Sequence, residues 1–399
     1  MDFEYIYPII VLFGSFAIML AVGVPITFAI GLSSLFSILI ALPPDAAISV
    51  ISQKMTVGLD GFTLLAHCNI LANTLFGAIS GSAVASAAAV GGIMSPLQEK
   101  EGYSPAFSTA INVASAPIGL MIPPSNVLIV YSLASGGTSV AALFLAGYLP
   151  GILTALALMT VAALYAHRHH YPVAERINLR QFLSVFRDSL PSLLLIFIII
   201  GGIIGGVFTP TEASAIAVIY SLALAAIYRE INVSKLRDIL LDSVVTSSIV
   251  LLLVGCSMGM SWAMTNADVP ELINEMITSV SENKWVILLI INLILLLVGT
   301  FMDITPAILI FTPIFLPIAQ HLGIDPVHFG IIMVFNLTIG LCTPPVGTIL
   351  FVGCSIGKIS IDKVVKPLLP MFLALFMVMA MICYFPQLSL LLPTLFAPS

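Results

Sequence analysis

Charged residues are scarce in this chain. Asp, Glu, Lys and Arg make up 8% of its 399 residues, whereas 60% are hydrophobic and the mean hydropathy is +1.16. A soluble domain carries about 25% charged residues, so the composition excludes a soluble enzyme, and no nucleic acid is expected as a partner. Apolar runs such as Leu190–Val207 recur along the chain, and each is near the roughly 20 residues that a helix needs to cross a bilayer. The sequence therefore predicts an all-α polytopic membrane protein.

Several motifs are also absent. Met1–Tyr7 contains no Lys or Arg, so the basic start of a signal peptide is missing. The five cysteines lack the spacing of a metal site, and we interpret them as small buried apolar residues. The chain has no HExxH, no GxSxG and no pair of intramembrane aspartates, so we do not expect an enzyme.

The few basic residues predict the orientation of the chain. Eleven of the thirteen Lys and Arg residues lie in four segments, which the positive-inside rule places in the cytoplasm. One further segment collects acidic residues beside Lys284 and is expected outside. The basic residues are Lys100; Arg168, Arg176, Arg180 and Arg187; Arg229, Lys235 and Arg237; and Lys358, Lys363 and Lys366. The acidic residues are Asp268, Glu271, Glu275 and Glu282.

The segments between these loops are expected to be helices. Trp285–Val298 is short for a crossing and is followed by GTFMD and a proline-containing run. It fits either a full crossing or the first arm of a re-entrant hairpin, and charge does not separate the two. The short arm and a tip at Gly299 favour the hairpin. The other expected elements are crossings at Leu143–Ala166, Leu190–Val207, Thr211–Tyr228, Ile239–Met264 and Pro367–Leu391, a crossing at Phe329–Phe351 broken at Thr343–Pro345, and a surface helix at Val269–Val280.

Two double-proline stretches interrupt this pattern at a fixed spacing. GLMIPPSNV (Gly119–Val127) and GLCTPPVGT (Gly340–Thr348) are 221 residues apart. Four full crossings lie between them, an even number, so the two copies face opposite ways through the membrane. The identical pairs at this spacing are Ile93 and Ile314, Pro96 and Pro317, Gly102 and Gly323, Pro105 and Pro326, Ile111 and Ile332, Val113 and Val334, Gly119 and Gly340, Leu120 and Leu341, Pro123 and Pro344, Pro124 and Pro345, and Gly136 and Gly357.

Inverted repeats with helices broken at matching positions are typical of secondary transporters, whose substrate and ion sites lie near the midplane. Irregular backbone is tolerated at that depth where it is buried or lines a cavity. Free carbonyls and hydroxyls suit a hard cation such as Na⁺, and helix N-termini suit a carboxylate. The alternatives are a simple proline kink in a packed helix, an ion channel and a structural subunit.

The hairpin tips are expected to meet the breaks. Tip 1 is GAISGSAVAS (Gly77–Ser86), and tip 2 is GTFMD (Gly299–Asp303), where Asp303 corresponds to Ser82. An ionised Asp near the bilayer centre costs roughly 2.5–3.5 kcal/mol, so it usually has a cationic partner or a function. Bound Na⁺ is one partner for Asp303; proton carriage and a solvated interfacial position are the alternatives. We interpret Glu212 as an acid at a helix N-terminus.

At this point the sequence resembles a known family, the large membrane subunit of tripartite ATP-independent periplasmic (TRAP) transporters, the DctM/SiaM-like permeases. The similar stretches span most of the chain. They are Leu75–Pro96, Gly102–Ser125, Leu143–Gly151, Gly205–Tyr220 and Met302–Val352.

The resemblance implies an Na⁺-coupled importer of small organic acids that works by an elevator motion, like other members of the ion transporter superfamily, in the bacterial inner membrane. It also implies two partners, a small four-helix membrane subunit and a periplasmic substrate-binding protein. Sialic acid is the expected substrate and a C4-dicarboxylate the next. The implied Na⁺ sites are Ser80, Gly81, Ser82, Pro124, Ser125 and Asn126 at tip 1, and Gly299, Thr300, Asp303, Thr343, Pro345 and Gly347 at tip 2. The implied substrate residues are Ser82, Ser125, Asn126, Thr300 and Thr348.

The chain departs from the family after Ala66, where a further span and a short helix are expected. Aligning Pro25 with Pro210 gives a spacing of 185 rather than 221, so about 36 residues are missing from the first copy. Two spans, Ile6–Val22 and Pro25–Leu42, place the N-terminus in the cytoplasm; a third would place it outside. We predict a mobile transport domain from residues 66–135 and 284–357, each with one hairpin and one broken helix. Scaffold helices occupy 1–65 and 136–283, the latter with the surface arm helix, and 358–399 is a C-terminal helix.

Overall fold

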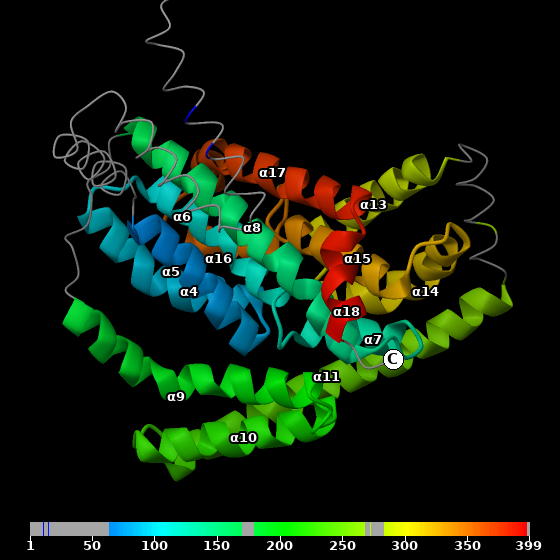
Figure 1. Ribbon diagram of the computed structural model, residues 1–399, viewed down its shortest axis with the longest axis horizontal. Coiled ribbons are helices and arrows are strands. Elements are labelled where there is room, and N and C mark those ends of the chain that lie inside the picture. Colours follow the sequence, from blue (N-terminus) through cyan, green and yellow to red (C-terminus); the bar gives the residue numbers. More distant parts are fainter. Residues whose placement is uncertain are drawn as a thin grey trace, which may run out of the picture. The chain divides into compact units, whose positions relative to one another are not determined.

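The computed structural model describes residues 64–169, 179–267 and 283–396, together with Val11, Ser15 and Leu272. The chain forms two compact units, Met1–Thr63 and Leu64–Ser399, and the second contains nearly all described residues. Every regular element among these residues is a helix (Figure 1). The predicted spans Ile6–Val22 and Pro25–Leu42 and the surface helix Val269–Val280 lie outside the described residues, apart from single positions.

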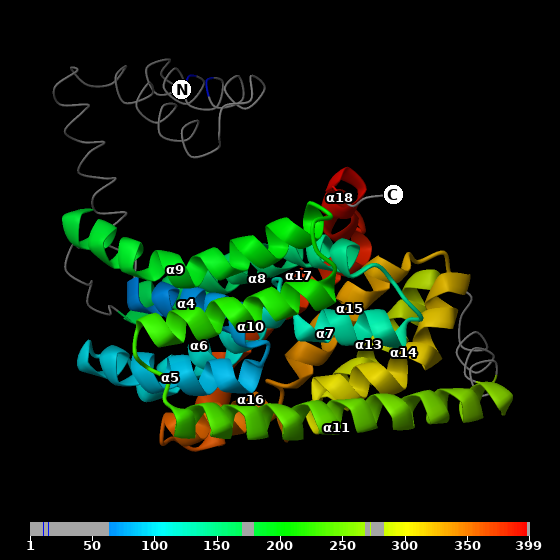
Figure 2. The same cartoon turned by 90° about the horizontal axis from the view of Figure 1, so that it is seen from below.

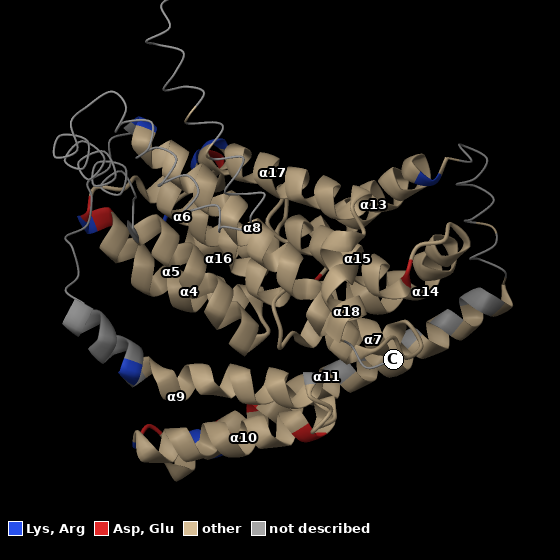
Figure 3. Ribbon diagram, viewed as in Figure 1, with Lys and Arg blue, Asp and Glu red and all other residues tan. Residues whose placement is uncertain are grey.

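Six helices in the described part are long and apolar enough to span a membrane, so the chain is a multi-pass membrane protein. Their charged residues gather at the helix ends and in the loops (Figure 3). The six segments are Val140–Arg168, Pro210–Ile227, Val233–Met260, Lys284–Phe301, Ile304–His321 and Ile361–Tyr384.

The first copy of the repeat is a helical hairpin followed by a broken helix. Gly81, with φ of 63°, and Ser82 form the turn of the hairpin, where the Ser82 hydroxyl accepts a hydrogen bond from Ala85 N at 3.2 Å and so begins the second arm. Pro123 and Pro124 cannot continue a helix, and the chain is irregular over Met121–Ser125. The elements are α4 (Leu64–Ser80), α5 (Ala83–Lys100), α6 (Pro105–Ser115), the 3₁₀ helix η1 (Ala116–Leu120) and α7 (Asn126–Ala134).

The second copy has the same order of elements. Its hairpin turns at Met302–Asp303, and its helix is broken over Leu341–Gly347. The Pro123–Pro124 and Pro344–Pro345 peptide bonds are both cis. The elements are α13 (Lys284–Phe301), α14 (Ile304–His321), α15 (Pro326–Gly340) and α16 (Thr348–Ile356).

The last half-helix of each copy packs on the other copy (Figures 1 and 2). Helix α7 contacts α14 and α15: the Tyr131 hydroxyl donates to Pro326 O at 2.7 Å, and the Tyr131 ring lies against Gly330. Helix α16 contacts α5 and α6, where Gly353 lies against Val113. The two copies therefore share one core.

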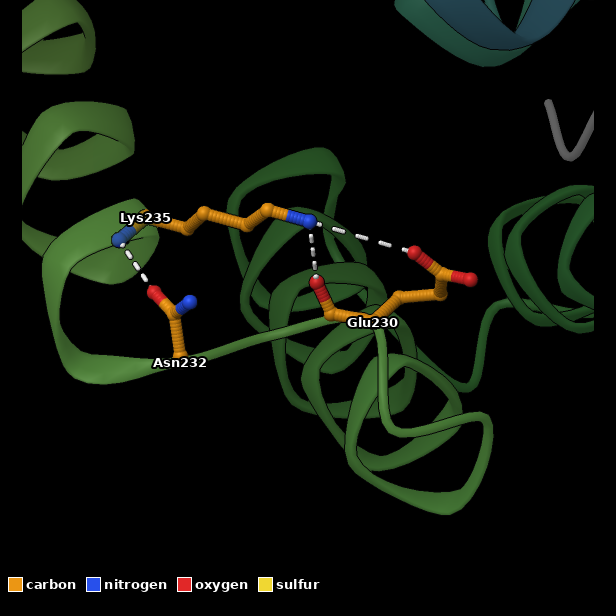
Figure 4. Close-up of polar contacts among 3 residues, drawn as sticks. All are labelled: Glu230, Asn232 and Lys235. Carbon is orange, nitrogen blue, oxygen red and sulfur yellow. Dashed lines mark hydrogen bonds and ion pairs between the residues drawn. The ribbon is translucent and has the colours of Figure 1, made fainter.

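The remaining helices join and flank the copies. They are α8 (Val140–His169), α9 (Leu179–Ile204), α10 (Pro210–Ile227), α11 (Val233–Asn266), α17 (Ile361–Tyr384) and α18 (Gln387–Phe396). Glu212 completes a capping box with Thr209 at the start of α10, which confirms its predicted place at a helix N-terminus. Between α10 and α11, Asn232 Oδ1 accepts from Lys235 N at 2.8 Å, and Lys235 Nζ donates to Glu230 O at 3.0 Å (Figure 4).

Two boundaries and the burial of the cysteines differ from the sequence prediction. The predicted last span, Pro367–Leu391, is two helices, because the chain breaks at Phe385–Pro386 between α17 and α18. The first arm of the second hairpin is not short: α13 has 18 residues and continues past Gly299 to Phe301. Its shortness therefore does not argue for a re-entrant hairpin. The cysteines also differ, since Cys256 is exposed while Cys342, Cys354 and Cys383 are buried as predicted.

Candidate functional site

A cavity lies where the two hairpin tips meet the two helix breaks. Its volume is about 630 Å³. Tip 1 contributes Gly81 and Ser82, and tip 2 contributes Asp303. The breaks contribute Leu120 and Asn126 in the first copy and Leu341 and Thr348 in the second; the other lining residues are Ala83, Val84, Val127, Thr246, Ile249, Ile304, Thr305, Pro306 and Val352.

Four helices begin at this cavity. Residues of the first turns of α5, α7, α14 and α16 line it, and the first N–H groups of a helix have no partner within the helix. Each helix start carries a partial positive charge, so four of them favour an anion. The sixteen described residues that line it include no Lys, Arg or His. Recognition of an anion here would depend on helix N-termini, amides and hydroxyls.

Tip 1 lies against the first break through Gly81 and Asn126. A Cβ at Gly81 would come within 3.0 Å of Asn126 Cγ and 3.2 Å of Asn126 Oδ1, and the φ of 63° is one that L side chains rarely adopt, so glycine is favoured at this approach. Ser125 is buried, and its hydroxyl donates to Leu120 O while accepting from Leu128 N at 3.4 Å. The structure thus brings Gly81, Ser82 and Asn126 together at the cavity, whereas the Ser125 hydroxyl is bonded inside the break.

Tip 2 is bonded directly to the second break. Gly347 N donates to Thr300 O at 3.1 Å. A Cβ at Gly347, where φ is 45°, would lie 2.8 Å from Thr343 O and 3.0 Å from Leu341 O, so carbonyl oxygens crowd the bare side of this glycine. Carbonyl oxygens are the ligands that hard cations prefer. The Thr300 hydroxyl is elsewhere engaged, since it donates to Leu297 O at 2.6 Å.

Asp303 differs from its counterpart Ser82 in what its side chain does. Both residues precede the second arm of a hairpin, but Ser82 caps α5 whereas the Asp303 side chain makes no cap bond to α14. Asp303 is exposed, lines the cavity and has no ion pair among the described residues. Its carboxylate is therefore available to a ligand.

Thr348 lines the cavity, and its hydroxyl oxygen is buried without a hydrogen-bond partner in the described part of the chain. The other predicted site residues are not among those that line the cavity. Ser80 is exposed at the end of the first arm, with its hydroxyl 3.4 Å from Ser82 O. Pro124, Gly299, Thr343, Pro345 and Gly347 belong to the tips and breaks next to it.

Sequence reasoning missed several lining residues. Leu120 and Leu341 are an identical pair in the repeat, and that pairing was the available signal. Thr246 and Ile249 come from α11, outside both copies, and nothing in the sequence connects them to the tips. No group of three or more His, Cys, Asp or Glu residues among the described residues could hold a metal ion. Carbonyls, hydroxyls and Asp303 are thus the cation ligands this site offers.

Buried amides hold each hairpin to its broken helix. In the first copy Asn73 Nδ2 donates to Asn69 Oδ1 at 2.8 Å, Asn112 Oδ1 at 2.9 Å and Ser115 Oγ at 2.9 Å. These bonds attach both arms of hairpin 1 to α6, because Asn112 Nδ2 also donates to Ala87 O of α5 at 2.8 Å. In the second copy, the buried amide bonds attach only the first arm, α13, to the broken helix.

The link in the second copy joins Asn336 of α15 to Asn292 of α13. Asn336 Nδ2 donates to Asn292 O at 2.9 Å and to Asn292 Oδ1 at 2.8 Å. The first hairpin therefore has the more extensive polar attachment.

Multiple apolar helices, a duplicated hairpin and broken helix, and a shared internal cavity define a multi-pass membrane protein built from two related copies. The comparisons identify the family. Residues 64–388 match the model of the tripartite ATP-independent periplasmic transporter, DctM component. The chain belongs to this family of TRAP large permeases, as the resemblance in the sequence predicted.

Three relatives are similar over most of their length. An uncharacterized protein, YgiK, of Salmonella typhimurium is 91% identical over 435 residues, covering 100% of both chains. A C4-dicarboxylate TRAP transporter large permease protein, DctM, of Pseudomonas aeruginosa is 40% identical over 82% of this chain and 77% of its own. A sialic acid TRAP transporter large permease protein, SiaM, of Vibrio cholerae is 33% identical over 96% of this chain and 98% of its own.

YgiK has aligned positions that this chain lacks, and their number matches the shortening of the first copy. The alignment runs over 435 positions whereas this chain has 399 residues, so 36 aligned positions have no residue here. The two repeat spacings, 185 and 221, differ by the same number.

Proposed function

We propose that the chain is the large permease subunit of a TRAP transporter that carries a small organic acid across the bacterial inner membrane together with Na⁺. The observation that carries this proposal is the cavity at which four helix N-termini meet and whose described lining contains no basic side chain. Such a cavity suits an acid group that must be held and then released, because helix dipoles attract an anion without a fixed ion pair.

The ion assignment rests on the second tip and break. Asp303 has a carboxylate without a cap bond, and the carbonyls of Thr300, Leu341 and Thr343 lie around Gly347. This is an oxygen-only set that fits a hard monovalent cation. In the first copy, Gly81, Ser82 and Asn126 offer the corresponding oxygens at the other tip. Two or more Na⁺ ions are proposed, one at each tip.

The depth of the tips supports re-entrant hairpins. Tip 2 meets α15 at its C-terminal end, and α16 continues for a further nine residues, about 13 Å of helix, beyond that point. A hairpin whose tip stops partway along a crossing helix turns back inside the bilayer. With the copies inverted, one hairpin opens to each side, and an elevator movement of residues 66–135 and 284–357 against the other helices provides alternating access.

Two partners follow from the family: a small four-helix membrane subunit and a periplasmic binding protein that delivers the substrate. The relatives named above carry C4-dicarboxylate and sialic acid in their names, and both compounds bear carboxylates. Sialic acid is the first substrate to test and a C4-dicarboxylate the next, since a cavity without Lys or Arg leaves selection largely to the binding protein.

The test is uptake into proteoliposomes that contain the full chain together with a small membrane subunit of the family, with a periplasmic binding protein added outside. Radiolabelled sialic acid, succinate and malate are offered under an inward Na⁺ gradient and, at equal ionic strength, under choline. We expect saturable uptake that requires Na⁺. Undiminished uptake in choline driven by a pH gradient would instead establish proton coupling, and a current that does not saturate with substrate would establish a channel-like subunit.

A further inference from the structure

Each hairpin touches its broken helix through a pair of glycines close to the tip. In the first copy, a Cβ at Gly119 of η1 would lie 2.4 Å from Gly77 Cα and 2.5 Å from Ala78 N. In the second copy, a Cβ at Gly340 of α15 would lie 2.6 Å from both Gly299 Cα and Gly299 C. The obstructing atoms are backbone, which cannot rotate away, so the two main chains are in direct contact only because no side chain separates them.

The two pairs occupy equivalent places with respect to the ion sites. Gly119 and Gly340 each stand seven residues before the residue that meets the tip, Asn126 and Gly347 respectively. On the hairpin side, Gly77 O accepts from Gly81 N at 2.9 Å, and the residue after Gly299 is Thr300, whose carbonyl accepts from Gly347 N at 3.1 Å. Each glycine contact therefore lies within one helical turn of a tip.

Gly77 and Gly299 are not paired by the repeat spacing, because the residue 221 positions after Gly77 is Val298. The two hairpins thus reach the same backbone contact from positions that differ by one residue. Because both copies keep a glycine contact although its position along the hairpin differs by one residue, we infer that the short distance between the two backbones is itself required.

We propose that the pairs Gly77–Gly119 and Gly299–Gly340 are positioning residues that fix each hairpin tip against its break and thereby set the affinity of that tip for Na⁺. This inference rests on the proposed Na⁺ coupling. Cation ligands must be placed to within about 0.2 Å. An alanine at Gly119 must move the hairpin by about 1 Å before its Cβ reaches the 3.4 Å of an ordinary contact. A misplacement of about 1 Å in a functional site can reduce activity by up to about 100-fold.

The structure supplies a graded series of single substitutions. Gly119→Ala and Gly340→Ala impose the largest displacement. Gly77→Ala and Gly299→Ala impose a smaller one, since their closest atoms would be 3.0 Å away, and they keep the test informative if the severe variants do not fold.

Two glycines provide matched controls. Gly92 lies on the second arm of hairpin 1 with nothing within 4 Å of its added Cβ. Gly330 would clash with the Tyr131 ring at 2.4 Å, but it lies ten residues, about 15 Å of helix, before the contact at Gly340.

The experiment measures Na⁺-dependent thermal stabilisation of the purified full chain in detergent, with NaCl replaced by choline chloride at constant ionic strength. We expect Gly119→Ala and Gly340→Ala to raise the half-saturating Na⁺ concentration about tenfold or more. The Gly77 and Gly299 variants should raise the half-saturating Na⁺ concentration less, and Gly92→Ala should leave it unchanged. Gly330→Ala should lower the melting temperature in choline but leave the half-saturating Na⁺ concentration unchanged.

The outcomes are distinguishable. A wild-type chain that Na⁺ does not stabilise would overturn both the Na⁺ coupling and this inference. Two results would overturn the inference alone, provided that Na⁺ stabilises the wild-type chain. In one, all four contact variants keep the half-saturating Na⁺ concentration of the wild type. In the other, Gly330→Ala shifts that concentration as much as the contact variants do.

Discussion

Replacing Asn73 by alanine should destabilise the protein more than replacing Asn292, although both amides join a first hairpin arm to a broken helix. Asn73→Ala leaves two buried acceptors, Asn69 Oδ1 and Asn112 Oδ1, without the donor that each has in the native structure. Asn292→Ala leaves Asn336 Nδ2 bonded to the backbone oxygen of residue 292 at 2.9 Å. The two changes remove the same side chain, so the volume lost is equal. Asn292→Ala also removes the weak bond from Asn292 Nδ2 to Cys383 Sγ at 3.4 Å, which works against the expected order.

The magnitude follows from the orphaned groups. An unsatisfied buried acceptor costs about 1–3 kcal/mol in soluble proteins, whereas side-chain hydrogen bonds inside membrane proteins average about 0.6 kcal/mol. Two orphaned acceptors therefore give an extra loss of at least about 1 kcal/mol for Asn73→Ala. A change of 1 kcal/mol moves the melting temperature by about 2–4 °C in a domain of 150–250 residues and by less in a longer chain.

The assay is thermal unfolding of the full chain followed by the fluorescence of its two tryptophans, with Asn266→Ala on the exposed end of α11 as the control. The control should melt with the wild type, and Asn73→Ala should melt at least about 1 °C below Asn292→Ala. An equal or larger loss for Asn292→Ala would refute the view that hairpin 1 is the more firmly attached of the two.

Three further substitutions test the cavity and the core. Asp303→Asn should leave the melting temperature in choline unchanged but lower Na⁺-driven uptake about tenfold or more, because it removes a charged interaction of about 1.5–3 kcal/mol; full uptake by this variant would exclude the carboxylate as an ion ligand. Thr348→Val removes a buried hydroxyl that has no partner in the described structure, so it should keep or raise the melting temperature while raising KM for the substrate, and an unchanged KM would remove Thr348 from the substrate site. Tyr131→Phe removes the hydrogen bond from the Tyr131 hydroxyl to Pro326 O and should cost about 1 kcal/mol of stability with KM unaffected; a calorimetric or fluorescence melting curve matching the wild type would contradict that role.

Local chemistry was enough to predict much of the architecture. Proline lacks an N–H and cannot continue a helix, so the double prolines predicted both breaks, and long apolar runs predicted α8, α10 and α11. The same local logic failed at the C-terminal end. Pro367 and Pro370 lie inside α17, whereas Pro386 ends the helical run, and the sequence does not show which prolines packing will accommodate.

The site was predictable where it lies on the repeat and not elsewhere. Ser82, Asn126, Asp303 and Thr348 all line the cavity, because tips and breaks could be located from the sequence, while their roles in binding stay predictions. Thr246 could not be found, because its place depends on how α11 packs on α14.

The buried amides gave a partial signal. Asparagines within apolar runs are expensive unless they are bonded, which marks Asn73, Asn112 and Asn336 as residues with partners, but the identity of each partner depends on contacts 39 to 44 residues away in sequence.

The contacts of Tyr131 with Pro326 and Gly330, and of Gly353 with Val113, make each copy complete only in the presence of the other. The duplicated unit resembles one subunit of an arm-exchanged dimer whose two chains have become covalently joined. A single copy expressed alone would have its final half-helix without a surface to cover. A difference between the copies, such as Ser82 in one tip and Asp303 in the other, must therefore be compatible with packing against the partner half.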